Sequence, residues 1–426
     1  MPRLLCCLFA LIVLGTALAP TVFSFQVPSD SLMRKGQQQY AESRFLESVQ
    51  TYLKAGADHG PASARYALGL AYAGLNDFPN AIRSLQLATQ KDSLNALYHF
   101  QLAQVLVKSG APQDAEREYE LVTQMDSTYL AAFFQLGALL NSQQQNEKRQ
   151  AELFSRVLVL NPNDYISWHF LSRAVAKQGM KDSALACLKR SLEINPNYFG
   201  ATEEMAKVNF KSKNYKEALP FYQRAIELQP TTARLHFELG ECYRQESKFP
   251  DAIRSFQNAI ELDTLNAMYV GQLGQAYFYS QQYDSSIAAY EKAIAIDPDG
   301  PIYHLNLALI YQRLDSTQLA VKEFEGAIAA SHPDKIADLY EKLGGFYFNK
   351  RLYKEAIAAF GKALQYEPTS KDANLYLGYA YESLRDPKSA IKHFERYLFL
   401  TQEDSTGNRQ RQDLRREVDA LKKSSR

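Results

Sequence analysis

Histidine, the commonest metal ligand and general base, is scarce in this chain, with seven residues among 426. Three of them, His99, His236 and His304, fall at one place of a repeating pattern, which Trp168 occupies in another copy. We therefore expect these three imidazoles to replace a large ring that packs at a helix start. Because no two of the three lie in adjacent copies, the sequence predicts no metal site.

The candidate nucleophiles lack the surroundings that would activate them. Ser389 and Lys392 have the Ser-x-x-Lys spacing of some serine enzymes, but the residues between them match a helix-packing pattern. Cys187 and Cys242 occupy non-equivalent places and no Cys-x-x-Cys occurs, so buried thiols are expected and a disulfide is not indicated. Phosphate-binding loops, His-Glu-x-x-His and Gly-x-Ser-x-Gly are absent. The sequence predicts neither an enzyme nor a cofactor.

Composition narrows the choice of partner. The chain has 48 Lys and Arg against 47 Asp and Glu, whereas nucleic-acid binders need a basic excess to neutralise phosphates. Nucleic acid is therefore not expected as a partner. Aromatic residues are unusually frequent, with 27 Tyr and 23 Phe but one Trp, which indicates a fold that places rings at regular intervals.

One pattern recurs along most of the chain. Leu239-Gly240 and Tyr243 return 34 positions later as Leu273-Gly274 and Tyr277. Leu, Gly and Tyr at relative positions seven, eight and eleven form a stripe on one helix, and Ala, Phe or Tyr, and Ala at twenty, twenty-four and twenty-seven form a stripe on a second. Small residues let the two helices cross closely, and a proline at position thirty-two ends the second helix in several copies.

These motifs resemble the tetratricopeptide repeat family over almost all of residues 29–404. The resemblance implies an all-α fold, a right-handed superhelical α-solenoid of tandem helix-turn-helix repeats. An array of this kind leaves no room for a catalytic domain. Eleven copies begin near Ser29, Ala62, Ala96, Leu130, Tyr165, Phe199, Ala233, Ala267, Pro301, Ala337 and Lys371.

Three copies depart from the pattern. The first has Lys35 and Gln39 where Leu and Tyr are expected, which predicts a frayed or capping unit. The fourth has one extra residue within 141–146, which predicts a longer turn. The ninth has two extra residues around 331–334, for which we expect an irregular but rigid turn. A hinge or a change of superhelical pitch is the alternative for both insertions.

Residues 405–426 are expected to form a C-terminal basic capping helix. Leu414, Val418 and Leu421 recur at i, i+4 and i+7, and would cover the last hydrophobic face of the stacked array. Arginines and lysines occupy the other faces. Contact of this basic helix with a partner or a membrane surface is the alternative.

The order of residue types in 1–28 predicts that the protein is exported from the cytoplasm. Arg3 precedes an apolar run at 4–15, and small residues follow, which is the order of a secretory signal peptide. Pro20 disfavours cleavage and apolar residues continue to Phe25, so an uncleaved membrane anchor is the alternative. Both interpretations keep Arg3 in the cytoplasm and translocate the rest. We therefore expect an extracytoplasmic protein, periplasmic or secreted.

The resemblance also implies where partners bind. In this family the first helix of each repeat lines a concave groove through positions two, five, nine, twelve and thirteen. The middle of the groove is expected to be basic with rings interleaved, which suits an extended acidic peptide with apolar anchors; the alternative is a merely solvated surface. The candidate groove residues are Tyr66, Phe100, Phe134, His169, Arg173, Lys177, Lys207, Phe210, Lys211, Phe237, Arg244, Phe278, Tyr279 and Arg313.

The sequence thus predicts a scaffold or adaptor that holds proteins or extended peptides outside the cytoplasm. A second hypothesis is a membrane-tethered component of an envelope machine, such as polysaccharide export or outer-membrane assembly. A third is the non-catalytic subunit of an enzyme complex.

Overall fold

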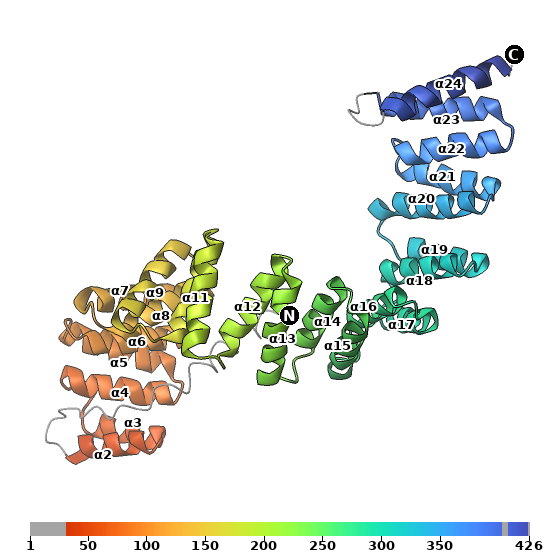
Figure 1. Cartoon of the computed structure of the whole chain (residues 1–426). Coiled ribbons are helices and arrows are strands. Elements are labelled where there is room, and N and C mark those ends of the chain that lie inside the picture. Colours follow the sequence, from red (N-terminus) through yellow and green to blue (C-terminus); the bar gives the residue numbers. More distant parts are fainter. Residues whose placement is uncertain (1–30, 403–407, 425–426) are drawn as a thin grey trace. The chain divides into compact units, whose positions relative to one another are not determined.

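The computed structural model describes residues 31–402 and 408–424, and every regular element in them is a helix (Figure 1). Eleven consecutive helix pairs, numbered here as repeats 1 to 11, are followed by one helix, α24 (Asn408–Ser424). The first helices of the pairs are α2 (Ser31–Ala41), α4 (Ala62–Gly74), α6 (Ala96–Ser109), α8 (Leu130–Ser142), α10 (Tyr165–Lys177), α12 (Phe199–Lys211), α14 (Ala233–Gln245), α16 (Ala267–Tyr279), α18 (Pro301–Arg313), α20 (Pro333–Asn349) and α22 (Lys371–Ser383). The second helices are α3 (Phe45–Lys54), α5 (Phe78–Lys91), α7 (Pro112–Met125), α9 (Glu147–Leu160), α11 (Lys181–Ile194), α13 (Tyr215–Leu228), α15 (Phe249–Leu262), α17 (Tyr283–Ile296), α19 (Thr317–Ala329), α21 (Tyr353–Tyr366) and α23 (Pro387–Leu400). The predicted all-α array of tandem helix pairs is confirmed.

A missing side chain sets how closely the two helices of a pair approach. A Cβ atom built on Gly240 of α14 would lie 2.7 Å from the ring of Phe256 on α15. At the equivalent place in repeat 11, a Cβ atom on Gly378 would collide with the ring of Phe394. Both phenylalanines are fully buried, so the rings occupy the space that the glycines leave.

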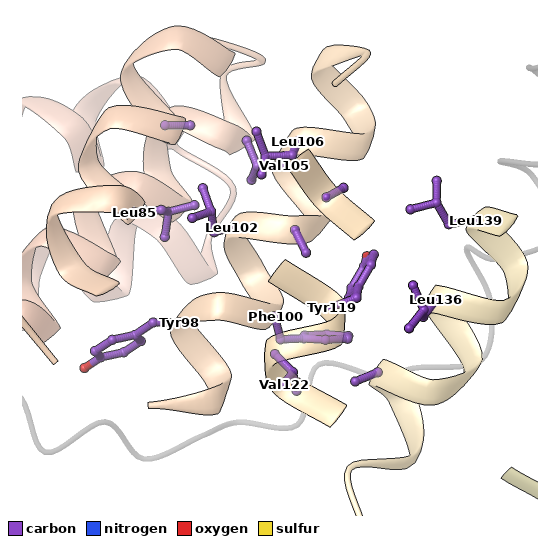
Figure 2. Close-up of a cluster of buried hydrophobic side chains, with 14 of the residues drawn as sticks. Leu85, Tyr98, Phe100, Leu102, Val105, Leu106, Tyr119, Val122, Leu136 and Leu139 are labelled. Atoms are coloured by element: carbon purple, nitrogen blue, oxygen red, sulfur yellow. The ribbon is translucent and has the colours of Figure 1, made fainter. Parts of the chain in front are cut away.

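Aromatic and leucine side chains fill the space between successive helices. In repeats 3 and 4, Phe100 of α6 lies against Tyr119 of α7 with ring centroids 5.7 Å apart, and Leu102 and Leu136 belong to the same buried cluster (Figure 2). Each such side chain contributes about 1.5–3 kcal/mol when it is removed from water. This regular use of rings accounts for the high Tyr and Phe content.

The turn within a pair needs one residue in the left-handed conformation. Ser247 has a φ angle of 58° and Gln281 one of 63°. The next residue, Lys248, then donates its N–H to the carbonyl of Tyr243 at 2.8 Å, which closes the end of α14. The predicted turns at 247–248 and 281–282 are confirmed.

The extra residue of repeat 4 lengthens its turn, as predicted. Four residues, 143–146, separate α8 from α9, and both Gln144 and Asn146 have positive φ angles, of 55° and 50°. The side chain of Asn146 accepts a hydrogen bond from the N–H of Arg149 at 3.1 Å and caps α9.

The two extra residues of repeat 9 extend a helix. Helix α20 has 17 residues, against 13 in α18, because it begins a turn early at Pro333. Proline is tolerated there since the first turn of a helix needs no N–H donor. The interpretation of 331–334 as a turn was therefore wrong for Pro333 and Asp334. Helix α19 packs more loosely on α20 than α13, α15, α17 and α21 pack on the helices that follow them.

Both ends of the described array are formed. In repeat 1, the hydroxyl of Ser48 donates to the carbonyl of Gly36 at 2.7 Å and joins α3 to α2. At the other end, Leu414 and Val418 of α24 are buried in one cluster with Phe394 of α23. Helix α24 thus covers apolar surface of the last repeat.

The chain divides into two compact units, and the division falls after Tyr198, between repeats 5 and 6. Among the described residues, no helix combines the length and apolar character needed to cross a bilayer. The predicted signal or anchor at 1–28 lies outside the described residues, as do 403–407 and 425–426.

Two glycine substitutions in the second unit should have opposite effects. Gly240→Ala should lower the free energy of unfolding by about 1–3 kcal/mol, because the added methyl overlaps the Phe256 ring. Gly361→Ala on α21 should raise it by up to about 1 kcal/mol, because open space surrounds that position and alanine favours the helix. Amide hydrogen exchange in α14–α15 and in α21 measures both effects. Changes of the same sign in the free energy of unfolding of the two variants would contradict this account of the packing.

Candidate partner-binding surface

The three singled-out histidines are held by local contacts. Nδ1 of His99 lies 2.6 Å from a carboxylate oxygen of Glu118, and His304 makes the corresponding contact with Glu323 at 2.7 Å. Nε2 of His236 is 2.9 Å from the carbonyl oxygen of Pro230 in the preceding repeat. Within the part of the chain that the structure describes, no three His, Cys, Asp or Glu residues are grouped so as to hold a metal ion.

The candidate nucleophiles have structural roles. The N–H of Ser389 donates to Asp386 at 3.2 Å in the capped first turn of α23, while Lys392 is exposed. Cys187 and Cys242 are free and buried. Burial and, to a lesser extent, neighbouring glutamates raise the pKa of the Cys242 thiol to about 12, which disfavours the reactive thiolate.

Three of the expected groove residues are packing residues. The side chains of Tyr66, Phe100 and His169 are only 2%, 6% and 8% exposed. Tyr66 stacks on Tyr98 of the next repeat with centroids 4.7 Å apart, and His169 lies edge-on to Tyr198 at 5.4 Å. In these three repeats the residue at position five therefore packs against its neighbours and offers a partner almost no surface, which corrects the expectation for these three residues.

Four other groove rings are half-buried. The clearest case is Phe237, which stacks on Tyr269 of the following repeat at 4.8 Å and keeps part of its surface accessible. These rings contribute to packing and to the groove at once. They are Phe134, Phe210, Phe237 and Phe278.

Part of the basic middle of the groove is paired with glutamates. Nζ of Lys207 lies 3.0 Å from Glu203, and Arg234 forms ion pairs with both Glu203 and Glu238. Burial acts to raise the pKa of Glu203, but hydrogen bonds from Arg234 and Lys207 outweigh it and hold that pKa below its usual range. Two cations thus face two carboxylates, and the expected positive charge is cancelled at this point.

The remaining cations of the groove divide into paired and unpaired groups. Arg244 forms two hydrogen bonds with Glu241, at 3.1 and 2.9 Å. No ion pair joins any described residue to Arg173, Lys177 or Lys211. The first two of these belong to the first unit and Lys211 to the second, so positive charge is available on each unit separately.

An apolar part of this surface was missed in the sequence. Met268 of α16 and Ile302 and Leu309 of α18 are 48%, 52% and 43% exposed, and Tyr279 at the end of α16 is 50% exposed. The side chain of Arg313 on α18 donates to the Tyr283 hydroxyl at 2.9 Å. Position-by-position inspection would have found the three aliphatic residues, because they occupy positions two and nine.

A row of helix pairs that exposes apolar and charged side chains along its first helices defines a helical-repeat scaffold. Family models described as Tetratricopeptide repeat match residues 66–129, 165–198, 198–265 and 347–407, and a model described as TPR repeat matches 274–315. The chain belongs to the tetratricopeptide repeat family, with about eleven repeats. Proteins of this family bind protein partners.

Solved structures with similar helix pairs include yeast Tom70, which is 16% identical with a TM-score of 0.39 over 92% of this chain and 95% of that one. MamA is 26% identical with a TM-score of 0.36 over 38% and 94%. The C-terminal part of a TPR repeat-containing protein from Cytophaga hutchinsonii is 20% identical with a TM-score of 0.46 over 65% and 97%. No curated protein matches the chain. At TM-scores below 0.5, these likenesses carry no information on its partner.

The ion pairs of repeats 6 and 7 predict a pH-dependent stability. Because the pKa of Glu203 is lowered on folding, its contribution is present above the pKa of the unfolded chain and is lost as the pH falls through the folded value. Glu203→Gln should therefore cost on the order of 1 kcal/mol at pH 7 and progressively less as the pH falls to about 3. Chemical unfolding at both pH values measures the difference.

The control for that experiment is Asp338→Asn. Asp338 pairs with Lys342 at 2.7 Å on the exposed surface of α20, where such pairs contribute little. Equal losses in the two variants, or a Glu203→Gln loss that persists at low pH, would contradict the assigned role of Glu203.

Proposed function

We propose that this chain is an extracytoplasmic protein-binding scaffold that holds an extended peptide or protein along its first helices. The observation that carries the proposal is the exposure of Met268, Ile302 and Leu309 on α16 and α18. Soluble proteins rarely expose several large aliphatic side chains on one face unless that face meets a partner. This surface is referred to below as the apolar face of repeats 8 and 9.

Charged residues flank the apolar face along the chain. Lys211 ends α12 and Arg313 ends α18, both in the same unit. Apolar anchors supply most of the free energy of an interface, while charges around them orient the partner and speed its association. A segment with apolar side chains and a few acidic residues fits this arrangement.

Location outside the cytoplasm rests on the order of residues in 1–28, where a basic start, an apolar run and small residues follow one another. The same segment supports the second candidate, a membrane-tethered component of an envelope assembly or export machine, because Pro20 disfavours cleavage. A non-catalytic subunit of an enzyme complex would use the same partner surface.

Mass spectrometry of the chain from its native membrane fraction separates these candidates. A mature chain that begins near Phe25 or Gln26 indicates a free exported scaffold. A chain that retains Arg3 in the membrane fraction indicates the tethered form. A full-length chain found entirely in the cytoplasm would contradict both.

Photo-crosslinking tests the binding face. A benzoyl-phenylalanine placed at Ile302 should capture one partner in the native compartment, and the same group at Leu265 should not, although Leu265 is 79% exposed in the loop before α16. Replacement of Met268 and Leu309 by Ser in the Ile302 crosslinking chain should weaken capture on the order of 10-fold to 100-fold. Replacement of Leu94 and Leu265, both exposed in loops, is the control and should leave capture unchanged. Equal capture of the partner from positions 302 and 265 would contradict the proposal.

A further inference from the structure

Two junctions between repeats of ordinary length are closed by the same kind of hydrogen bond. The side-chain amide of Gln223 on α13 donates to the hydroxyl of Tyr243 on α14 at 2.8 Å. One repeat later, Gln257 of α15 donates to Tyr277 of α16 at 3.1 Å. In both cases twenty positions separate the donor from the tyrosine.

The junction between repeats 9 and 10 lacks this bond. The equivalent residues are Glu325 of α19 and Tyr347 of α20, which the two extra residues place twenty-two positions apart. Among the described residues, no hydrogen bond joins them, and a cavity of about 320 Å³ lies at this junction. The helices around it are α19, α20 and α21, which follow one another in Figure 1. The cavity lining includes Glu325, Ile328, Tyr340, Tyr347, Glu355 and Lys362.

The chemistry of the lining is aromatic and acidic. Glu325 and Glu355 are exposed, and neither forms an ion pair with any residue in 31–402 or 408–424. Both carboxylates act on the same ring: after burial, their charges are the next causes of the raised pKa of Tyr347. The ammonium of Lys362 already lies over the Tyr340 ring, 5.2 Å from its centroid. Two carboxylates against one ammonium leave the cavity with a net negative charge.

We propose that this cavity is a second binding site, on α19–α21, that takes an arginine side chain presented by a protein partner. The guanidinium would lie on the face of Tyr347 and donate to the carboxylates of Glu325 and Glu355. This site lies off the apolar face of repeats 8 and 9, so it adds a separate contact to the scaffold function proposed above.

Arginine fits this lining better than the other candidate side chains. Its planar guanidinium stacks on an aromatic ring and donates to carboxylates in the same plane, which a lysine ammonium cannot do. Its aliphatic stem would pack on Ile328 and Leu343 at the cavity wall. A purely apolar side chain would make no interaction with the two carboxylates.

A small probe tests the site without knowledge of the partner. The full chain, labelled with ¹³C at isoleucine methyl groups, is titrated with the acetylated and amidated peptide Gly-Ser-Arg-Ser-Gly at millimolar concentration. The Ile328 methyl signal should shift in a saturable way. The same peptide with citrulline, which keeps the shape of arginine but not its charge, should give no shift.

Variants assign the response to the two carboxylates. The double variant Glu325→Gln with Glu355→Gln should bind the arginine peptide about tenfold more weakly. Glu291→Gln is the matched control, since Glu291 occupies the same position in repeat 8 and lies outside the cavity. Lys362→Met should have the opposite effect and strengthen binding, because it removes a competing cation of similar length.

The outcomes of this titration can be distinguished from those of photo-crosslinking on the apolar face of repeats 8 and 9. A shift of Ile328 that is specific to arginine and weakened only in the double variant supports the site. No shift, an equal shift with citrulline, or an undiminished shift in the double variant overturns it, whatever photo-crosslinking at position 302 shows. A thermal unfolding curve of the double variant like that of the unsubstituted chain confirms that both are folded.

Discussion

The whole array depends on the close crossing of the two helices of each pair at a position that holds only glycine, alanine or serine. In repeat 7 the ring of Phe256 fills the space above Gly240, and in repeat 11 Phe394 does the same above Gly378. A buried large side chain of the second helix, a ring in nine repeats and Leu85 or Leu188 in the other two, fixes the distance between the paired helices. Each pair then packs on the next within its unit. Stability therefore accumulates repeat by repeat along each unit.

The packing of the repeats also determines which side chains remain accessible to a partner. Tyr66 and Phe100 were expected to contact a partner, but their rings are buried between packed helices. The cations Lys207 and Arg234 form ion pairs with glutamates of the same unit. What remains accessible is an apolar set on α16 and α18 with separate positive charges along the chain. Within each unit, recognition is therefore left to the few side chains that packing does not need.

Much of this was predictable from the sequence, because the repeated Leu-Gly-Tyr spacing specifies the first helix of a pair and the Ala-Phe-Ala spacing the second, with small residues where they cross. The burial of His169 was not, since the position alone does not say whether a ring turns to the groove or to the next repeat. Nor could the pairing of Arg234 with Glu203 be read from charges 31 positions apart. The insertion near Pro333 was located correctly, but its residues extended α20 because proline suits the first helical turn as well as it suits a loop.

The central claim is that a protein partner binds the first-helix face of repeats 8 and 9. Hydrogen exchange of the chain with and without the partner captured at position 302 tests it most directly. The account predicts slower exchange in α16 and α18 when the partner is bound, with the second helices α15 and α17 little changed. Protection confined to α15 and α17, or to the loops between repeats, would contradict it.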